Sequence, residues 1–226
     1  MMRPRAARRA AEQRLVWQAA SLLLAYPDSE HRTRLELVAQ LCAHLPREQA
    51  EPLLRVATEL GSLSEVAAAQ QFTETFDLRR RATLLLTYWT DGDTRNRGTA
   101  MLAFSEAYRG AGVEPPSGEV ADHLPVVLEF AATVDPVAGG ALLTAYRRAI
   151  HAIGLALSDE DSRYAPVLSA VIATLPQATE QDLGWARRLV DTGPAAESVG
   201  LAPFTLTVPP RRTAQGREPA VAKGLR

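Results

Sequence analysis

The sequence has 226 residues, of which 46% are hydrophobic and 23% are charged, and this is enough for one sizeable hydrophobic core. The formal net charge is -1, so no global basic field attracts nucleic acid. The one cysteine, Cys42, excludes an intramolecular disulfide, and every apolar run is far shorter than the roughly 20 residues of a transmembrane helix. We expect one domain with no nucleic-acid partner and no membrane insertion.

The N-terminus is basic and rich in alanine. Arg8-Arg9 is similar to the arginine pair of a twin-arginine export signal. A charged and polar segment follows, however, and no small-residue cleavage site is evident before residue 26. We therefore expect residues 1–11 to be a flexible basic leader on a cytoplasmic protein.

The fold class follows from the absence of alternating β-branched runs and from the abundance of alanine and leucine, which favour helices. The sequence predicts an all-α, single-domain helical bundle over residues 12–190. The tail, 191–226, accumulates Gly, Pro and Arg without periodicity, and we expect it to be largely disordered. About ten helices are expected, over 12–25, 30–44, 48–60, 64–76, 77–90, 94–110, 122–134, 137–157, 164–175 and 180–190.

Several helix ends are marked by residues with a known capping preference. Tyr26-Pro27 ends the first helix, because the residue before a proline is disfavoured in the helical region. Ser62 or Ser64 caps the helix that ends near residue 76, and Ser62 has the capping-box spacing to Glu65. Thr179 is expected to cap the last helix. Cys42 falls on the apolar face of its helix, which predicts a small buried hydrophobe.

The turn Asp91-Gly92-Asp93 resembles the start of a calcium-binding loop. The sixth position of that loop is Asn96 instead of glycine, and the twelfth is Leu102 instead of glutamate. The calcium interpretation fails on these two residues. A turn with helix-capping carboxylates explains the segment better.

Arginines gather near this turn, at 79–81, Arg95 and Arg97. Asp77, Asp91 and Asp93 lie close to them in the sequence, so a solvated, salt-bridged face is one interpretation. Contact with an acidic group of a partner, or with a nucleotide-bearing cofactor, is the other, because guanidinium groups suit both acceptors.

Asp122-His123 is the sharpest local feature. An aspartate at a helix start caps the helix, and this alone explains Asp122. The pair also suits recognition of a partner's backbone or side chain, and Glu129 lies about two helical turns further along the same side. An enzyme using Asp122-His123 for acid–base chemistry lacks a nucleophile or metal, since no G-x-S-x-G, H-E-x-x-H or C-x-x-C occurs.

Taken together, these motifs give the chain a family resemblance. Phe76-Asp77, the segment 81–86, the segment 95–101, Asp122-His123-Leu124-Pro125 and Leu128-Glu129-Phe130 are similar to the NarJ family, the delta-chain assembly chaperones of respiratory nitrate reductase. These are related to TorD/DmsD-type chaperones. The segment 22–27, which ends in Tyr-Pro, and the segment 162–165 also match. The resemblance covers residues 12–190.

The resemblance implies an all-helical, cofactor-free chaperone and not an enzyme. Its partner would be the apo catalytic α subunit of nitrate reductase, held competent for molybdenum cofactor insertion and membrane assembly. An apolar groove would take an amphipathic helix from the N-terminal segment of that subunit. A homodimer is compatible with the sequence. The residues expected to bind the client are Asp77, Arg81, Tyr88, Trp89, Asp91, Arg95, Arg97, Asp122, His123, Leu124 and Glu129.

A helical ligand-sensing or regulatory module is the alternative. It would need an enclosed apolar pocket and usually a DNA-reading helix pair near one end. The basic leader is too short and aperiodic to supply that pair.

Overall fold

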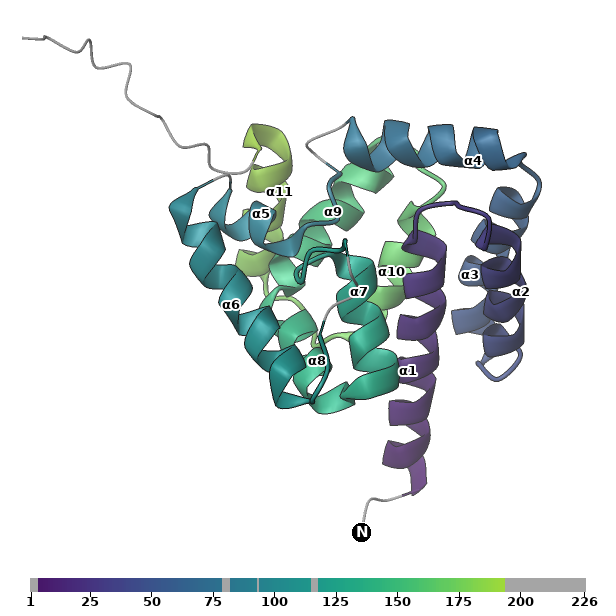
Figure 1. Cartoon of the computed structure of the whole chain (residues 1–226), viewed down its shortest axis with the longest axis horizontal. Helices are drawn as coiled ribbons and strands as arrows, with labels where there is room; N and C mark the ends of the chain where they lie inside the picture. Colours follow the sequence, from purple (N-terminus) through teal and green to yellow (C-terminus); the bar gives the residue numbers. More distant parts are fainter. Residues whose placement is uncertain (1–3, 79–81, 93, 115–117, 194–226) are drawn as a thin grey trace, which may run out of the picture.

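The protein is described by a computed structural model over residues 4–78, 82–92, 94–114 and 118–193 (Figure 1). Helices account for the regular structure in these ranges, which contain one isolated bridge and no strand, so the all-α prediction is confirmed. The helices are α1 (Pro4–Leu24), α2 (His31–Cys42), α3 (Arg47–Gly61), α4 (Glu65–Phe72), α5 (Leu86–Asp91), α6 (Arg95–Gly110), α7 (Leu124–Glu129), α8 (Pro136–Ala145), α9 (Arg147–Asp159), α10 (Ala165–Thr174) and α11 (Glu180–Thr192). Two π-helical segments, η1 (Thr73–Asp77) and η2 (Phe130–Val134), extend α4 and α7.

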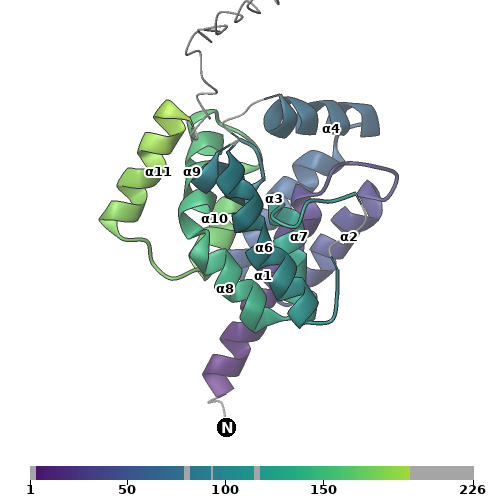
Figure 2. The same ribbon diagram turned by 60° about the vertical axis from the view of Figure 1, so that its left-hand side comes forward.

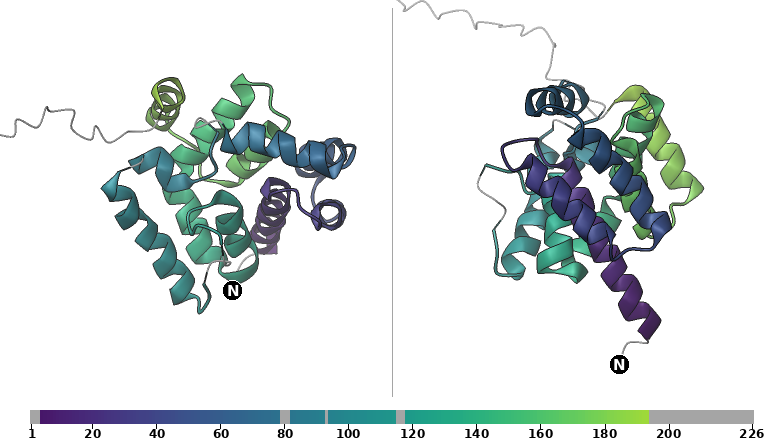
Figure 3. Two further views of the ribbon diagram at one scale, coloured as in Figure 1. Left: turned by 45° about the horizontal axis from the view of Figure 1, so that its top comes forward. Right: turned by 90° about the vertical axis from the view of Figure 1, so that its right-hand side faces the viewer.

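Helix α1 is the element around which the others pack. It contacts α2, α3, α7, α10 and η2, and Ala19 and Ala20 are fully buried where these neighbours approach. The short side chains of these two alanines allow the helices to come close. Helices α2 and α3 lie on one side of α1, and α6 lies at the far side of the molecule (Figure 3).

Helix α1 begins at Pro4, so residues 4–11 continue the first helix and are not the flexible leader that the sequence predicted. Alanine and arginine are strong helix formers, and Arg8 pairs with Glu12 one turn later at 2.7 Å. This end of the helix projects beyond the body of the molecule (Figure 1, Figure 2). The predicted tail lies outside the described residues from position 194 onward.

The helix predicted over 77–90 is wrong in its first half. Among its described residues, Asp77 belongs to η1, residues 82–85 are not helical, and α5 begins at Leu86. The amide of Leu124 donates to the carbonyl of Leu84, and the amide of Leu86 donates to the carbonyl of Asp122. These long-range hydrogen bonds hold the segment extended although its side chains fit a helical pattern.

The single helix predicted over 137–157 is also wrong, because α8 ends at Ala145 and α9 begins at Arg147. The break occurs at Tyr146, whose ring packs on Phe104 of α6 with ring centroids 4.8 Å apart. Contact with another helix therefore accompanies the change of direction.

The predicted caps have mixed outcomes. Thr179 accepts a hydrogen bond from the amide of Asp182, which confirms the predicted cap. The Asp182 side chain in turn accepts from the amide of Thr179 and completes a capping box. The α4 cap is Ser64, whereas the hydroxyl of Ser62 donates to the carbonyl of Glu59, so the Ser62 capping box is wrong. Cys42 is 2% exposed, and burial raises the pKa of its thiol to about 11, which confirms its place in the core.

Helix α11 packs against α9, contributes Ala186 and Val190 to the core, and is also linked to α9 by a buried carboxylate. Asp182 is fully buried and contacts Arg147 at 2.8 Å and Arg148, both at the start of α9. Hydrogen bonds from Arg148 and from the amide of Thr179 hold the pKa of Asp182 well below its usual range. Figure 2 shows α11 lying alongside α9.

No helix in the described part of the chain combines the length and the apolar composition needed to cross a bilayer.

Candidate functional site

Two segments that are distant in the sequence meet at the start of α7. The isolated antiparallel bridge joins Leu85 to His123, with hydrogen bonds of 2.9 and 3.1 Å on either side. This contact brings η1, the start of α5 and the start of α7 to one end of the molecule. It forms the frame on which the candidate site is built.

Asp122 lies inside this frame and not on its surface. Its side chain is 0% exposed, and Oδ2 accepts hydrogen bonds from the Thr87 amide at 3.0 Å and the Thr87 hydroxyl at 2.5 Å. Arg97 of α6 approaches the same oxygen at 3.9 Å and donates through Nε to the Thr87 hydroxyl at 3.2 Å. The aspartate therefore caps α5 from a distant segment.

The predicted role of Asp122 as the N-cap of its own helix is wrong. His123 occupies the N-cap position of α7, and no side-chain hydrogen bond caps that helix. The other oxygen of Asp122, Oδ1, is buried and has no hydrogen-bond partner in the described protein. Asp122 thus joins α5, α6 and α7 and has no exposed surface for a partner.

An aromatic cluster packs against the other side of the frame. The Phe72 and Phe76 rings lie 4.8 Å apart, and Phe76 makes an edge contact with Tyr164, also at 4.8 Å. Tyr26, just after α1, makes an edge contact with Phe72 at 5.4 Å. The three inner rings are buried, but Tyr26 is 51% exposed, so the cluster reaches the surface.

A cavity of about 170 Å³ opens beside these rings. Its lining combines Phe72 and Phe76 with residues 83–85 and with Asp77, Glu119, Val120 and His123. We use the name η1 surface for four residues of this lining, Asp77, Glu119, Val120 and His123, together with Tyr26, whose ring contacts Phe72, and Leu78, which follows Asp77 in the chain.

The η1 surface is apolar with an acidic border. Leu78 is 73% exposed and Val120 is 37% exposed, so both present apolar side chains to solvent. The ring of His123 contacts the carboxylate of Glu119 at 2.8 Å, and Asp77 lines the same cavity. This combination favours a partner with an apolar face and a basic or N–H-donating group.

The predicted client-binding residues do not form one surface. Asp77 and His123 meet at the η1 surface. Trp89 and Leu124 are core side chains, 1% and 0% exposed. Arg97 joins the internal network around Asp122. Arg81 lies outside the described residues. The other four predicted residues lie away from the η1 cavity: Tyr88, Asp91 and Arg95 near the α5–α6 turn, and Glu129 on the exposed side of α7.

Sequence reasoning missed Glu119, Leu78 and Val120. Glu119 and Val120 lie in a loop without periodicity, and Leu78 falls on the apolar stripe of the helix predicted over 77–90, which assigned it to the core. Tyr26 was noted as a helix end and as part of the matching segment 22–27, and not as a binding residue.

The chemistry of this region suits binding. No group of three or more His, Cys, Asp or Glu side chains in the described ranges is arranged to hold a metal ion. The polar groups of the η1 surface are carboxylates and one imidazole beside an apolar cavity, and such groups suit contact with another protein.

Residues 35–170 match the family model described as nitrate reductase delta subunit. This match includes η1, the bridge and the Asp122 network. It covers well over half of the chain.

Three relatives illustrate the similarity. The chain is 51% identical over 160 residues to the nitrate reductase-like protein NarX of Mycobacterium tuberculosis, which covers 71% of this chain but 24% of NarX. It is 30% identical over 165 residues to the probable nitrate reductase molybdenum cofactor assembly chaperone NarJ of Bacillus subtilis, covering 73% of this chain and 90% of that protein. It is 28% identical over 165 residues to the NarJ chaperone of Escherichia coli K12, covering 72% and 70%. The chain thus spans about a quarter of NarX and most of each NarJ.

Proposed function

The chain belongs to the nitrate reductase delta subunit family, and from that premise we propose that it is a chaperone for the catalytic α subunit of respiratory nitrate reductase. It binds the apo α subunit in the cytoplasm and keeps it competent for molybdenum cofactor insertion and membrane assembly. Two relatives that match most of their length are named molybdenum cofactor assembly chaperones, and this supports the proposal. The chaperone itself carries no cofactor and performs no catalysis in this proposal.

The observation that carries the proposal is the η1 surface. Its exposed side chains, Tyr26, Leu78 and Val120, are the kind that an amphipathic helix covers. Asp77 and Glu119 at the border give an orientation to a segment that carries basic residues. We therefore assign the N-terminal segment of the α subunit to this surface.

Release is as necessary as binding for a chaperone. The cavity of about 170 Å³ is small, so one or two side chains of the client enter it and the rest of the contact stays at the surface. Such a contact gives moderate affinity. Folding of the α subunit around its cofactor then removes the bound conformer from the equilibrium.

The helical ligand-sensing module is not favoured by these dimensions. Ligand pockets usually enclose about 300–1,000 Å³. The cavity at the η1 surface is smaller than this range. Two larger hollows, of about 1,030 and 790 Å³, are open to solvent and do not enclose a ligand.

Calorimetry with a synthetic peptide of the N-terminal segment of the cognate α subunit tests the proposal. We expect saturable binding with a negative heat-capacity change, because apolar surface is buried. Leu78→Asp and Val120→Asp should each weaken binding about tenfold, which is about 1.4 kcal/mol. Leu102→Asp, which adds the same charge at a 56% exposed leucine of α6, is the control and should leave the affinity unchanged.

Two results would contradict the proposal at different levels. Equal affinities for the Leu78→Asp and Leu102→Asp proteins would exclude the η1 surface as the binding site. Failure to bind both the peptide and the full apo α subunit, by a protein whose circular dichroism is that of a folded helical domain, would exclude the function. Sedimentation of the free protein tests separately whether it forms a homodimer.

A further inference from the structure

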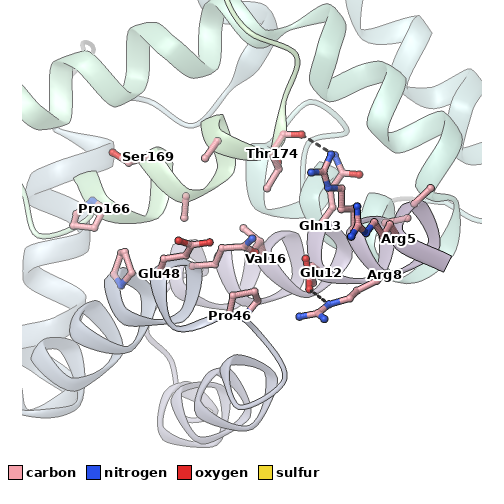
Figure 4. A pocket seen from close by; sticks show the side chains of 17 residues that line it. Arg5, Arg8, Glu12, Gln13, Val16, Pro46, Glu48, Pro166, Ser169 and Thr174 are labelled. Carbon is pink, nitrogen blue, oxygen red and sulfur yellow. Dashed lines mark hydrogen bonds and ion pairs between the residues drawn. The ribbon is translucent and has the colours of Figure 1, made fainter. Parts of the chain in front are cut away.

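A second hollow lies at the opposite end of α1 from the η1 surface. It is an open groove of about 1,030 Å³ between the N-terminal half of α1, the start of α3 and the outer side of α10. Figure 4 shows Arg5 and Arg8 at one end of this groove and Pro166 and Ser169 at the other. We call it the α1–α10 groove.

Small apolar side chains form part of the groove lining. Ala10 of α1 and Ala170 and Ala173 of α10 belong to this part, and longer polar side chains such as that of Gln13 line the rest. The hydrogen bond from the Gln13 amide group to the carbonyl of Thr174, 2.8 Å long, ties α1 to the end of α10 and keeps the two walls together.

Cationic groups are concentrated at the outer end of the groove. Arg5, Arg8 and Arg9 line it, and all three are exposed. Arg8 is paired with Glu12 at 2.7 Å. Arg5 and Arg9 form no ion pair with any residue that the structure describes, so two guanidinium groups are available at this end.

The dimensions of the groove suit a linear segment of protein. Its α1 wall runs from Arg5 to Val16, which is roughly 16 Å along the helix axis. About five residues of extended chain, or three turns of a helix, cover this length.

The charged residues of the groove determine which kind of anionic partner fits it. Glu12 and Glu48 also line the groove, and they would repel a continuous row of phosphates such as a nucleic acid or an anionic lipid surface presents. A second copy of this chain would place like-charged arginines against one another if α1 packed on α1. A protein segment that carries carboxylates only at one end avoids both conflicts.

We propose that the α1–α10 groove binds a short linear segment of a partner protein. The acidic residues of the segment lie against Arg5 and Arg9, and its small apolar side chains lie between α1 and α10. This inference is independent of the proposed function, since it concerns a separate surface with the opposite charge preference.

The test uses the full-length protein and a fluorescent synthetic peptide with glutamates at one end followed by alanine and leucine. We expect saturable binding in fluorescence anisotropy, weakened by salt because the arginines contribute. Arg5→Ala combined with Arg9→Ala should weaken binding about tenfold. Ala173→Trp, which fills the groove from an exposed position on α10, should weaken it by about the same factor.

Matched variants make each result specific. Arg32→Ala combined with Arg55→Ala removes the same charge from exposed positions outside the groove and should leave binding unchanged. Leu78→Asp at the η1 surface should also have no effect, which separates this proposal from the proposed function. A peptide with lysines in place of the glutamates should bind at least about tenfold more weakly.

Three outcomes would overturn the inference. The first is equal affinity for the glutamate and lysine peptides. The second is full binding by the Ala173→Trp protein. The third is no peptide binding together with binding to phosphatidylglycerol vesicles that is lost with Arg5 and Arg9, which would make the end of α1 a lipid contact.

Discussion

A single carboxylate, that of Asp122, joins three segments of the chain. It accepts hydrogen bonds from the amide and the hydroxyl of Thr87 at the start of α5 and lies 3.9 Å from Arg97 of α6. The nearby hydroxyl of Tyr108 donates to the carbonyl of Ala121, 3.0 Å away, and fixes the same loop to α6. Asp122 and His123 are adjacent in sequence but have different roles, because only His123 reaches the η1 surface.

Removing the Asp122 carboxylate should therefore lower stability. Asp122→Ala leaves the buried donors of Thr87 without an acceptor, and we expect a loss of about 2–3 kcal/mol in the free energy of unfolding, measured by urea denaturation. Asp122→Asn keeps an oxygen acceptor for the Thr87 amide and should lose less. A stable Asp122→Ala protein with weakened client binding would instead support the direct contact that the sequence suggested.

His31 should make stability depend on pH. It is 5% exposed at the start of α2, and neither ring nitrogen has a hydrogen-bond partner in the described structure. Burial lowers the pKa of His31, and Arg34 and Arg32 lower it further, against the opposing carboxylates of Asp28 and Glu65. The folded state thus disfavours the protonated imidazole.

The sign of the effect follows from this pKa. The unfolded chain takes up the proton near pH 6.5, whereas the folded protein does so at lower pH, so the free energy of unfolding should fall as the pH decreases below about 6.5. His31→Leu should make this decrease shallower. Burial also lowers the pKa of His151, so part of the slope should remain until His151 is replaced too. Denaturation curves across pH 5–8 would measure how the free energy of unfolding changes with pH. An unchanged slope in the His31→Leu protein would contradict the role of His31 in this change.

Close approach between elements is clearest where α8 returns over η2. A Cβ built on Gly139 would lie 2.4 Å from the Cα of Ala131 and 2.5 Å from its Cβ. Gly139 lies in α8 and Ala131 lies in η2, so relieving this contact requires a shift of one helical backbone. Only glycine allows α8 and η2 to pack at this distance.

Gly139→Ala should separate these two elements. We expect a loss of about 1–3 kcal/mol in the free energy of unfolding, from thermal or urea denaturation. Gly98→Ala is the matched control, because a Cβ there meets nothing within 4 Å. Alanine in a helix is favoured over glycine by about 0.5–1 kcal/mol, so Gly98→Ala should raise stability. Similar effects of both substitutions would argue against the close contact.

For the molecule as a whole, α1 separates two surfaces of opposite charge preference. It has 21 residues and is therefore about 30 Å long. The acidic, apolar η1 surface lies beyond its C-terminal end, where Tyr26 meets Phe72, and the α1–α10 groove with its arginines lies along its N-terminal half. The two surfaces share no residues, so substitutions in one should leave the other intact.

The candidate site was only partly predictable from the sequence. Asp77 and His123 were both predicted at or near helix starts, and the structure brings them to one cavity. Trp89 and Leu124 have the same hydrophobic character whether they face a groove or a core, so their burial was not predictable. Leu78 and Val120 belong to the surface because the tertiary structure leaves their side chains exposed. A local sequence pattern does not predict this exposure.

The sequence by itself determined the all-α class, most helix boundaries and the Thr179 cap, because helical periodicity and capping depend on residues within a few positions of one another. The tertiary structure decided the extended path of residues 82–85, the break at Tyr146 and the role of Asp122. Each of these depends on hydrogen bonds or packing between residues far apart in the chain: Leu84 with Leu124, Tyr146 with Phe104, and Asp122 with Thr87. Such contacts outweigh local helix preference, since a helix gains most of its stability in a protein from what it packs against.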